Sequence, residues 1–461
     1  MGITMQVLGL LLSLSILVLV HELGHYFFAR IFKTRVEKFY LFFNPWFSIM
    51  RAKKIEGKWN FSFFSSTSPE HWKDHPETTE WGIGWLPLGG YCSIAGMVDE
   101  TKGEKDLSAE PQEWEFRSKP AWQRFFIIIG GVLVNFIIAL VLYSVILFKW
   151  GEEYIPLENA RYGLQFSEVA LKTGFENGDK IIDIDGEKPE TIGDFVTGLM
   201  IDDVQKASVL RGDDTLTVYI PSDFGKQVLA NPKKGVCQYV FPFVIDSIIP
   251  NMPAAMAQLQ KGDSLVAIND SSLFSFYDFQ SLFNEHKNET ITLSYYRQNE
   301  LLHSLILLNE EGKIGVYPAH YLHFLKTKKN EYGFFTSIPK GISLGFNTLG
   351  VYVKQFKLVF SKEGATQLGG FGTIGSIFPK TWNWQQFWSM TALLSIILAF
   401  MNFLPIPALD GGYILFILVE MITRRKPSDK FVGYANMVGF TLLIALVLYA
   451  NGMDIIRALG F

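Results

Sequence analysis

The first apolar segment of the chain ends in a motif that could bind a metal. Residues 21–25 read HELGH and follow the uncharged run MQVLGLLLSLSILVLV. On a helix, His21 and His25 lie one turn apart on the same face, the spacing that brings two imidazole nitrogens onto one tetrahedral zinc ion. Glu22 projects beside them, close enough to act on a zinc-bound water. The pattern is typical of a zinc hydrolase, and such a site needs a third protein ligand.

Two carboxylates compete for the place of the third ligand. Glu37 is the nearest downstream, but it lies past the expected end of the apolar segment among basic residues, so we interpret it as a solvated or paired surface group. Asp410 lies in the stretch PIPALDGG at 405–412, whose prolines and glycines should take the backbone out of a plain helix. We therefore expect His21, His25 and Asp410 to bind the metal.

Simpler interpretations of these residues exist. The motif could be a coincidence or a buried hydrogen-bonded pair, and Asp410 alone could be an ordinary turn aspartate. Ionisable side chains inside a bilayer are rare and usually functional, so two such clusters at one expected membrane depth favour a metal site. The remaining histidines lie in polar stretches without a paired ligand pattern, and we expect ordinary surface positions for His71, His75, His286, His303, His320 and His323.

The composition indicates a membrane protein with sizeable aqueous parts. The 461 residues are 49% hydrophobic and 15% aromatic. The net charge of −4 is small for this length, and nothing in it indicates a nucleic-acid partner. The two cysteines, Cys92 and Cys237, are too few for a disulfide framework or a cysteine metal cluster.

Four apolar runs are long enough to cross a bilayer, which takes about 20 helical residues. They lie at 5–32, at 122–149, from Phe387 to the prolines at 405 and 407, and at 431–449. The first run has no basic residue before Arg30 and no small-residue cleavage site, so we expect it to stay attached rather than be removed as a signal peptide. Basic clusters follow the first run, precede the second and separate the third from the fourth, which predicts that these ends are cytoplasmic. Residues 150–385 and both termini then lie outside.

The outer region contains an internal repeat. Residues 174–195 and 258–279 share a Gly-Asp pair, a short aliphatic run and a closing Asp-Phe at one constant offset. The stretch NMPAAMAQLQKGDSLVAIND at 251–270 looks like the helix and following strand of a PDZ domain, a fold that binds extended peptides by strand addition. The alternative is a pair of β-rich spacers that keep bulky ectodomains away from the membrane site.

Two further segments flank the spans. Between Ile338 and Phe360, apolar residues recur at steps of three or four while lysines occupy other positions, which indicates an amphipathic helix at the membrane face or under the outer domains. Residues 39–91 are rich in aromatic residues and serine and contain turn signals. They predict a hairpin or small sheet that returns toward the metal site.

The four motifs together resemble the site-2 protease family of intramembrane zinc metalloproteases. They are HELGH, WLPLGGYCSIAGM at 85–97, Asn135 in the second span, and NFLPIPALDGG at 402–412. The resemblance covers nearly the whole chain and is to the branch of regulator of sigma-E protease type, which carries two PDZ domains between its second and third spans. It implies one zinc ion per chain on His21, His25 and Asp410, with Glu22 as the general base. Candidate substrate-binding residues are Asn402, which would hold the substrate strand or the oxyanion, and Asn135, Gly89 and Gly90.

Two positions depart from the family pattern. A Gly-Pro pair is usual at the start of the second span, where this chain has Gly130-Gly131, and Phe371 stands in the expected place of another proline. Neither change touches the zinc chemistry, so they concern local helix geometry.

The expected fold is a polytopic α-helical membrane protein with four transmembrane helices, two extracytoplasmic PDZ-like α/β domains and a small membrane-associated β-sheet. The expected segments are, in order, 1–34 (first span), 35–115 (cytoplasmic-side sheet and loop), 116–150 (second span), 151–235 and 236–325 (PDZ-like domains), 326–385 (amphipathic helix and linker), 386–425 (third span) and 426–461 (fourth span).

The resemblance also implies a function and a location. It implies cleavage of transmembrane segments of membrane-anchored substrates, such as anti-sigma-factor-type regulators and remnant signal peptides. Expected partners are single-span membrane substrates, the lipid bilayer and peptide C-termini at the PDZ-like domains. The expected location is the cell inner membrane, with those domains periplasmic and the active site near the cytoplasmic face. The alternative is a non-catalytic scaffold or metal-binding transporter, in which Glu22 would have no purpose.

Overall fold

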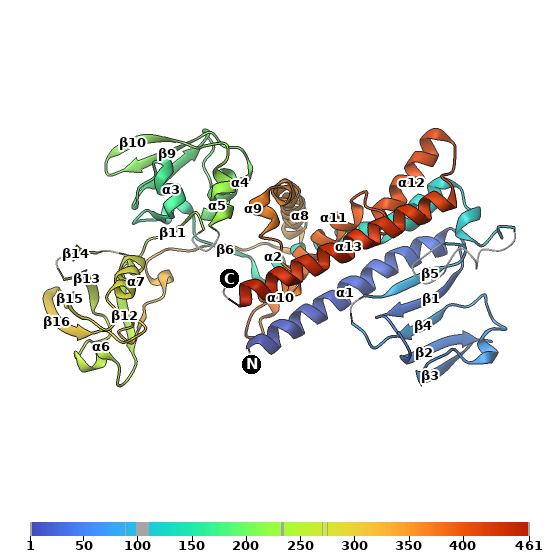
Figure 1. The fold of residues 1–461 in the computed structure, drawn as a ribbon, viewed down its shortest axis with the longest axis horizontal. Coiled ribbons are helices and arrows are strands. Elements are labelled where there is room, and N and C mark those ends of the chain that lie inside the picture. Colours follow the sequence, from blue (N-terminus) through green and yellow to red (C-terminus); the bar gives the residue numbers. More distant parts are fainter. Residues whose placement is uncertain are drawn as a thin grey trace. The chain divides into compact units, whose positions relative to one another are not determined.

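The chain divides into two compact units. The computed structural model describes residues 2–87, 89–97, 110–231, 235–269, 271–273 and 275–459. One unit comprises Met1–Gly151 and Glu331–Phe461, and the other comprises Glu152–Asn330 (Figure 1). The first unit holds every residue expected at the metal site.

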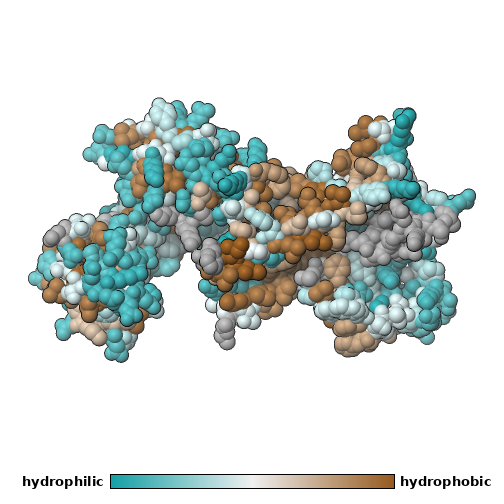
Figure 2. Space-filling view, in the orientation of Figure 1, coloured by the Kyte–Doolittle hydropathy of each residue, from teal (hydrophilic) through white to brown (hydrophobic). Residues whose placement is uncertain are grey.

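Among the residues that the structure describes, four helices in the first unit are long and apolar enough to cross a membrane, and they lie at the four predicted places. Their bounds are Gly2–Ile31 (α1), Ala121–Trp150 (α2), Trp384–Phe403 (α11) and Asp429–Ala458 (α13). Helix α11 ends just before Pro405, as the prolines predict, because proline cannot continue an α-helix. Figure 2 shows hydrophobic residues gathered over these long helices.

Helix α2 is the centre of this unit, since α1, α8 (Phe334–Phe356), α11 and α12 (Asp410–Thr423) all pack against it. The crossing of α1 and α2 is close because glycines meet there. A Cβ atom added to Gly24 would lie 2.3 Å from the carbonyl oxygen of Gly130. Small residues at a helix crossing let two backbones approach, a common feature of membrane helices.

Helix α8 covers the predicted amphipathic segment, and its small residues make the contact with α2. Ser337, Gly341 and Gly345 are buried, and a Cβ on Gly341 would clash with Ser144. The apolar stripe lies at the side of this contact, and Ile338 and Phe346 stay exposed there. Helix α8 runs antiparallel to α2, because Phe334 contacts Phe148 and Phe346 contacts Phe136. An exposed apolar stripe on a helix packed in this way is suited to contact with lipid.

A five-stranded sheet lies beside the C-terminal half of α1, in agreement with the predicted small sheet (Figure 1). Its strand order is β3-β2-β4-β1-β5, with β1 and β4 parallel and the other neighbours antiparallel. The strands are Val36–Leu41 (β1), Ser48–Ile55 (β2), Lys58–Ser65 (β3), Glu80–Ile83 (β4) and Tyr91–Ile94 (β5). The two edge strands are therefore β3 and β5, and β5 is the one that contacts α1.

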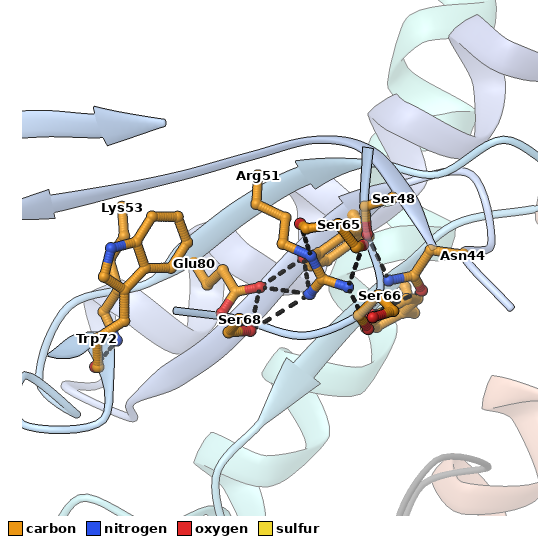
Figure 3. Close-up of polar contacts among 11 residues, drawn as sticks. Asn44, Ser48, Arg51, Lys53, Ser65, Ser66, Ser68, Trp72 and Glu80 are labelled. Atoms are coloured by element: carbon orange, nitrogen blue, oxygen red, sulfur yellow. Dashed lines mark hydrogen bonds and ion pairs between the residues drawn. The ribbon is translucent and has the colours of Figure 1, made fainter. Parts of the chain in front are cut away.

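A buried ion pair fixes the register of this sheet (Figure 3). Arg51 Nη1 donates to Glu80 Oε1 at 3.0 Å, and Tyr40 and Ser68 donate to the same carboxylate. Burial alone would raise the pKa of Glu80, but the hydrogen bonds from Tyr40, Ser68 and Arg51 outweigh burial and hold its pKa below the usual value. The guanidinium also donates to Ser65. The network therefore ties β1, β2, β4 and the end of β3 together.

Replacing Glu80 with glutamine should destabilise the sheet by about 3–5 kcal/mol, because Arg51 would stay buried without a counter-ion. Amide hydrogen exchange of β2 and β4 in the purified protein would measure the loss. Because the folded pKa of Glu80 lies below its unfolded value, its stabilisation is present above the unfolded pKa of about 4.5 and is lost as the pH falls through the lowered folded pKa.

The matched control is Glu70→Gln, because Glu70 pairs with Lys73 at an exposed position and such pairs contribute little. Equal exchange rates in the two variants would contradict a structural role for the buried pair.

Polar contacts attach the C-terminal end of α13 to the preceding segment. Asn451 Oδ1 accepts from the backbone of Phe371, and Asp454 Oδ2 accepts from that of Thr373. Arg457 donates to the carbonyl of Leu368. Most of α13 between its two ends is exposed, as expected for a helix that faces lipid. The short helices here are Lys362–Ala365 (α9) and Phe371–Ser376 (α10).

The second unit has two halves with separate hydrophobic cores. The first half contains the strands Leu164–Phe166 (β7), Lys180–Ile184 (β8), Lys206–Arg211 (β9), Asp214–Tyr219 (β10) and Cys237–Tyr239 (β11), and the helices Glu168–Thr173 (α3), Ile192–Ile201 (α4) and Phe224–Ala230 (α5). The second half contains Phe243–Ile248 (β12), Ser264–Ile268 (β13), Ser271–Ser272 (β14), Thr290–Arg297 (β15), Glu300–Leu307 (β16) and Val316–Pro318 (β17), with Pro253–Met256 (α6) and Phe276–Glu285 (α7). Glu152–Tyr154 (β6) pairs with Lys328–Asn330 (β18), so the first and last strands of this unit are joined.

The two halves contain matching local contacts. Buried Asp179 pairs with Arg211, and buried Asp263 pairs with Arg297. A capping box begins the longer helix of each half, from Thr191 to Asp194 in α4 and from Ser275 to Asp278 in α7. These aspartates belong to the two sequence segments that share the Gly-Asp and Asp-Phe pairs.

Cys92 and Cys237 form no disulfide. Burial raises the pKa of the Cys237 thiol to about 12, so it stays protonated at physiological pH. Cys92 lies in β5 of the first unit and Cys237 in β11 of the second.

Candidate metal centre and active site

The structure brings together His21, His25 and Asp410, which lie far apart in the sequence. The two histidines project from α1, and their Nε2 atoms lie 3.2 Å apart. Asp410 Oδ2 lies 3.1 Å from His21 Nε2 and 3.5 Å from His25 Nε2. Within the described ranges, this is the only group of three histidine, cysteine or acidic side chains spaced to hold a metal ion.

The spacing of these three atoms fits a zinc ion. Ligand atoms on a tetrahedral ion with bonds of about 2.0–2.1 Å lie about 3.3 Å from one another. The observed separations of 3.1, 3.2 and 3.5 Å bracket that value. Asp410 Oδ2 is also buried without a conventional hydrogen bond among the described residues. Two nitrogens and one oxygen form a donor set that zinc accepts, with the fourth position left for water or substrate.

The turn before α12 presents Asp410 to the histidines. Asp410 is the first residue of α12, and Ala408 just before it has a left-handed backbone with φ of 75°. A Cβ on Gly411 would lie 2.0 Å from the carbonyl oxygen of Leu404, so only glycine fits there. Asn436 of α13 accepts a hydrogen bond from the backbone of Ala408. The turn is therefore held by its own glycine and by a neighbouring helix.

A backbone carbonyl fixes the tautomer of His25. His25 Nδ1 lies 2.9 Å from the carbonyl oxygen of Ile127 in α2. A carbonyl can only accept, so Nδ1 carries the proton and the lone pair of Nε2 faces the cluster. Gly131 leaves room for both rings, since a Cβ there would lie 2.5 Å from His25 Nε2 and 2.7 Å from His21 Cε1.

Asn135 lies against His21 on the side away from the cluster. Its amide Nδ2 lies 3.4 Å from His21 Nδ1, and its Oδ1 is buried without a partner among the described residues. Rotation of the amide by half a turn exchanges these two atoms, which have nearly the same shape. Oδ1 would then accept a proton from Nδ1 of His21. Ser395 of α11 donates to the carbonyl oxygen of Asn135, which holds this part of α2 in place.

The sheet holds Glu22 beside the cluster. The carboxylate of Glu22 accepts a hydrogen bond from the backbone of Cys92 in edge strand β5, and it interacts electrostatically with both histidines and Asp410. Glu22 contributes none of the three converging ligand atoms. It is therefore placed to exchange protons with a molecule bound at the open side of the cluster.

Comparison with known proteins places the chain in a family. A model of Peptidase family M50 matches residues 9–66 and 63–446, which include the HELGH motif and Asp410. The chain belongs to peptidase family M50. This M50 peptidase is 26% identical to the Regulator of sigma E protease of Haemophilus influenzae, over 97% of this chain and 98% of that protein. It is 25% identical to a protein of Neisseria meningitidis named as a zinc metalloprotease, over 98% of this chain and 99% of that protein. A protein of Thermotoga maritima with the same name is 24% identical over 99% of this chain and 100% of that protein.

The structure gives the expected substrate-binding residues of this M50 peptidase different surroundings. Asn402 is half-buried near the end of α11, and its side chain makes no hydrogen bond to a described residue. Gly90 packs against α1, since a Cβ there would lie 3.1 Å from Val18 and 2.6 Å from the carbonyl oxygen of Tyr40. Gly89 packs against the ring of Phe43. Asn402 thus has a side chain available to a ligand, whereas the two glycines permit close packing.

Several supporting groups of this M50 peptidase were not predicted as such from the sequence. They are the carbonyl of Ile127, Gly131, the backbone of Cys92, and Asn436. Of these groups, only Gly131 was singled out in the sequence, as a position where the family usually has proline. The expectation that this departure concerns helix geometry alone is wrong, because Gly131 lies against the rings of His21 and His25. A side chain other than hydrogen there would overlap both imidazoles.

Proposed function

We propose that His21, His25 and Asp410 hold the zinc ion of this M50 peptidase and that Glu22 is its general base. The protein is an intramembrane zinc metalloprotease that cleaves membrane-anchored substrates. The convergence of the three ligand atoms at 3.1–3.5 Å, where the membrane-length helix α1 meets the start of α12, is the observation that carries the assignment. Such a site acts where its substrate is also embedded in lipid.

Different residues of the chain have different roles in the proposed hydrolysis. When bound, zinc polarises the scissile carbonyl and lowers the pKa of an attacking water. Glu22 takes the proton from that water and passes it to the leaving amine. The hydrogen bond from Cys92 keeps its carboxylate aimed at the open side of the cluster. The carbonyl of Ile127 holds His25 with its Nε2 toward the cluster.

A transmembrane helix must unwind locally before it can be cut, and its freed backbone groups then need new partners. We propose that the unwound segment adds to the edge of β5, because this strand ends the sheet and holds Glu22 through Cys92. Asn402, near the end of α11, is half-buried and makes no hydrogen bond to a described residue, so its amide is available to the substrate strand or the oxyanion.

Asn135 has a different proposed role, as a positioning residue for His21. Asn135→Ala is expected to weaken zinc binding by about 10–100-fold, as loss of a group that orients a metal ligand does. Competition with a fluorescent zinc chelator would measure the affinity. Asn402→Ala is the matched control and should keep zinc affinity while raising KM. Unchanged zinc affinity with a raised KM in Asn135→Ala would instead make Asn135 a substrate-binding residue.

The proposal also covers the role of the second unit, Glu152–Asn330, and the orientation of the protein in the membrane. The separate cores of the unit's two halves and their matching aspartate contacts support two PDZ-like domains, which bind peptide C-termini or act as a size filter. The sequence placed their boundary between 151–235 and 236–325, but Cys237–Tyr239 pairs with Leu164–Phe166, so the first domain extends through Tyr239. The basic clusters support an inner-membrane protein with these domains in the periplasm and the zinc near the cytoplasmic face. The proposed substrates are single-span proteins such as anti-sigma-factor-type regulators and remnant signal peptides.

Cleavage in proteoliposomes tests the proposed function. The full chain would be reconstituted with a tagged single-span protein that has a short ectodomain, with zinc present or removed by a chelator. Mass spectrometry of the fragments should place the cut inside the membrane segment, and the chelator should abolish it until zinc is restored. A cut confined to the ectodomain, or one that persists without metal, would refute the proposal.

A further inference from the structure

Helix α13 contacts the turn that carries Asp410. Asn436 of α13 is half-buried, and Gly439, one turn further along on the same face, is the only buried residue of this helix among those whose side chains the structure describes. A Cβ on Gly439 would lie 2.0 Å from the carbonyl oxygen of Pro407, so α13 meets the backbone of the turn directly. The preceding residue, Val438, is exposed. The packed side of α13 at this level is therefore the side that faces the turn.

The amide of Asn436 bridges the two sides of Asp410. Its Oδ1 accepts a hydrogen bond of 3.2 Å from the backbone N–H of Ala408, which lies two residues before Asp410. Its Nδ2 donates a hydrogen bond of 2.8 Å to the hydroxyl oxygen of Tyr413, which lies three residues after Asp410. A backbone N–H can only donate, so Oδ1 must face Ala408 and the orientation of the amide is fixed. One side chain of α13 thus holds both the turn before Asp410 and the first turn of α12 after it.

The turn needs such support because of its backbone conformation. Ala408 has a φ of 75°, a left-handed conformation that costs free energy for a residue with a Cβ and persists only where the surroundings hold it. Asp410 follows two residues later, so relaxation of Ala408 would move the carboxylate whose Oδ2 lies 3.1 Å from His21 Nε2. Metal affinity falls when a group that orients a ligand is lost.

We propose that Asn436 is a positioning residue for Asp410 and that zinc binding therefore depends on the attachment of α13 to this turn. The inference rests on the proposed zinc site and adds to it a residue from a helix that contributes none of the three ligand atoms. Coupling between two equilibria is reciprocal, so zinc should in turn strengthen the attachment of α13.

The test measures zinc binding by the full chain in detergent. Competition with a fluorescent zinc chelator would give the affinities of wild type, Asn436→Ala and Gly439→Ala. The first substitution removes the bridging amide, and the second places a Cβ against Pro407. Alanine favours a helix more than glycine does, so a loss of zinc affinity in Gly439→Ala would come from displacement of the turn rather than from a weaker α13.

Each variant has a matched control on the same helix. Asn451 also accepts a hydrogen bond from a backbone amide, that of Phe371 near the other end of α13, so Asn451→Ala loosens the helix away from the turn. A Cβ on Gly452 would meet no atom within 4 Å, so Gly452→Ala adds the same methyl group without a clash. Thermal unfolding without zinc would establish that all four variants are folded.

Asn436→Ala should weaken zinc binding by about 10–100-fold and Gly439→Ala should weaken it too, while both controls stay within about twofold of wild type. Hydrogen exchange gives a readout that needs no cleavage. Zinc should slow the exchange of backbone amides in residues 431–440 of wild type and of Asn451→Ala, but not of Asn436→Ala. Unchanged zinc affinity in both turn variants, or equal losses in the controls, would overturn the inference and leave the zinc site standing. Failure of wild type to bind zinc would overturn the proposed function and the inference together.

Discussion

Glu22→Gln is expected to lower the rate of peptide cleavage by about 10²–10⁴-fold while the protein keeps its zinc and its fold. Glutamine has nearly the same shape, and its amide oxygen can still accept the hydrogen bond from Cys92. It cannot take a proton from the attacking water. Zinc should remain because the three ligand atoms belong to His21, His25 and Asp410. Single-turnover cleavage in proteoliposomes would measure the rate, and elemental analysis the zinc.

Glu37→Gln provides the matched control for Glu22. Glu37 is the nearest other carboxylate downstream of the motif, and in the structure it pairs with Arg35 in the sheet region. Its replacement should leave the rate within about twofold, because an exposed or half-exposed ion pair contributes little. Full activity of Glu22→Gln would remove Glu22 from the chemistry, whereas zinc-loaded wild type that cleaves no more than the variant would favour the scaffold or transporter alternative. Loss of zinc from that variant would make Glu22 a ligand.

Asp410→Asn is expected to release zinc and abolish cleavage. An amide oxygen is a weaker and uncharged donor, and only two imidazoles would remain to hold the ion. The loss in zinc affinity should exceed the about 10–100-fold that follows removal of an orienting group. Zinc per chain, measured after dialysis of the purified protein against a weak chelator, should fall from about one to near zero.

Asp454→Asn is the control for Asp410. Asp454 also joins two helices of the same unit, α13 and α10, through Thr373, but it lies outside the cluster. It should therefore keep its zinc even if the protein loosens. Retention of zinc by Asp410→Asn would show that the third ligand lies elsewhere and would reopen the assignment of the site.

Local patterns were sufficient to predict the helices and the cluster. The uncharged run before His21 predicts a membrane-length helix, and the spacing of His21 and His25 predicts that both rings share a face. Pro405 ends α11 where expected, and the following residues present Asp410 at the start of a new helix. These features depend on residues close together in the sequence, which is why they can be read from it.

The groups that support the cluster could not be predicted in the same way. The contact between His25 and the carbonyl of Ile127, and that between His21 and Asn135, each join α1 to α2 across about a hundred residues. Their existence depends on the rotation of α2 about its axis, which the close approach of Gly24 and Gly130 sets. A uniformly apolar helix carries no periodic signal for that rotation.

The face of α8 is a second example. The apolar stripe around Ile338 and Phe346 predicts an amphipathic helix, but it does not say whether that stripe or the opposite face makes the protein contact. Gly341 and Gly345 decide it, because they allow the backbone of α8 to approach α2. In a membrane protein the larger apolar side chains can face lipid. Apolar character therefore does not predict which face of a helix is buried against protein.

X-ray absorption at the zinc edge of the purified full chain tests the central assignment most directly. We predict two imidazole nitrogens and further oxygen ligands at about 2.0–2.1 Å, with no sulfur at about 2.3 Å. The imidazole signal should fall when His25 is replaced by alanine. A sulfur ligand, or an imidazole signal unchanged by that replacement, would contradict a zinc site built from His21, His25 and Asp410.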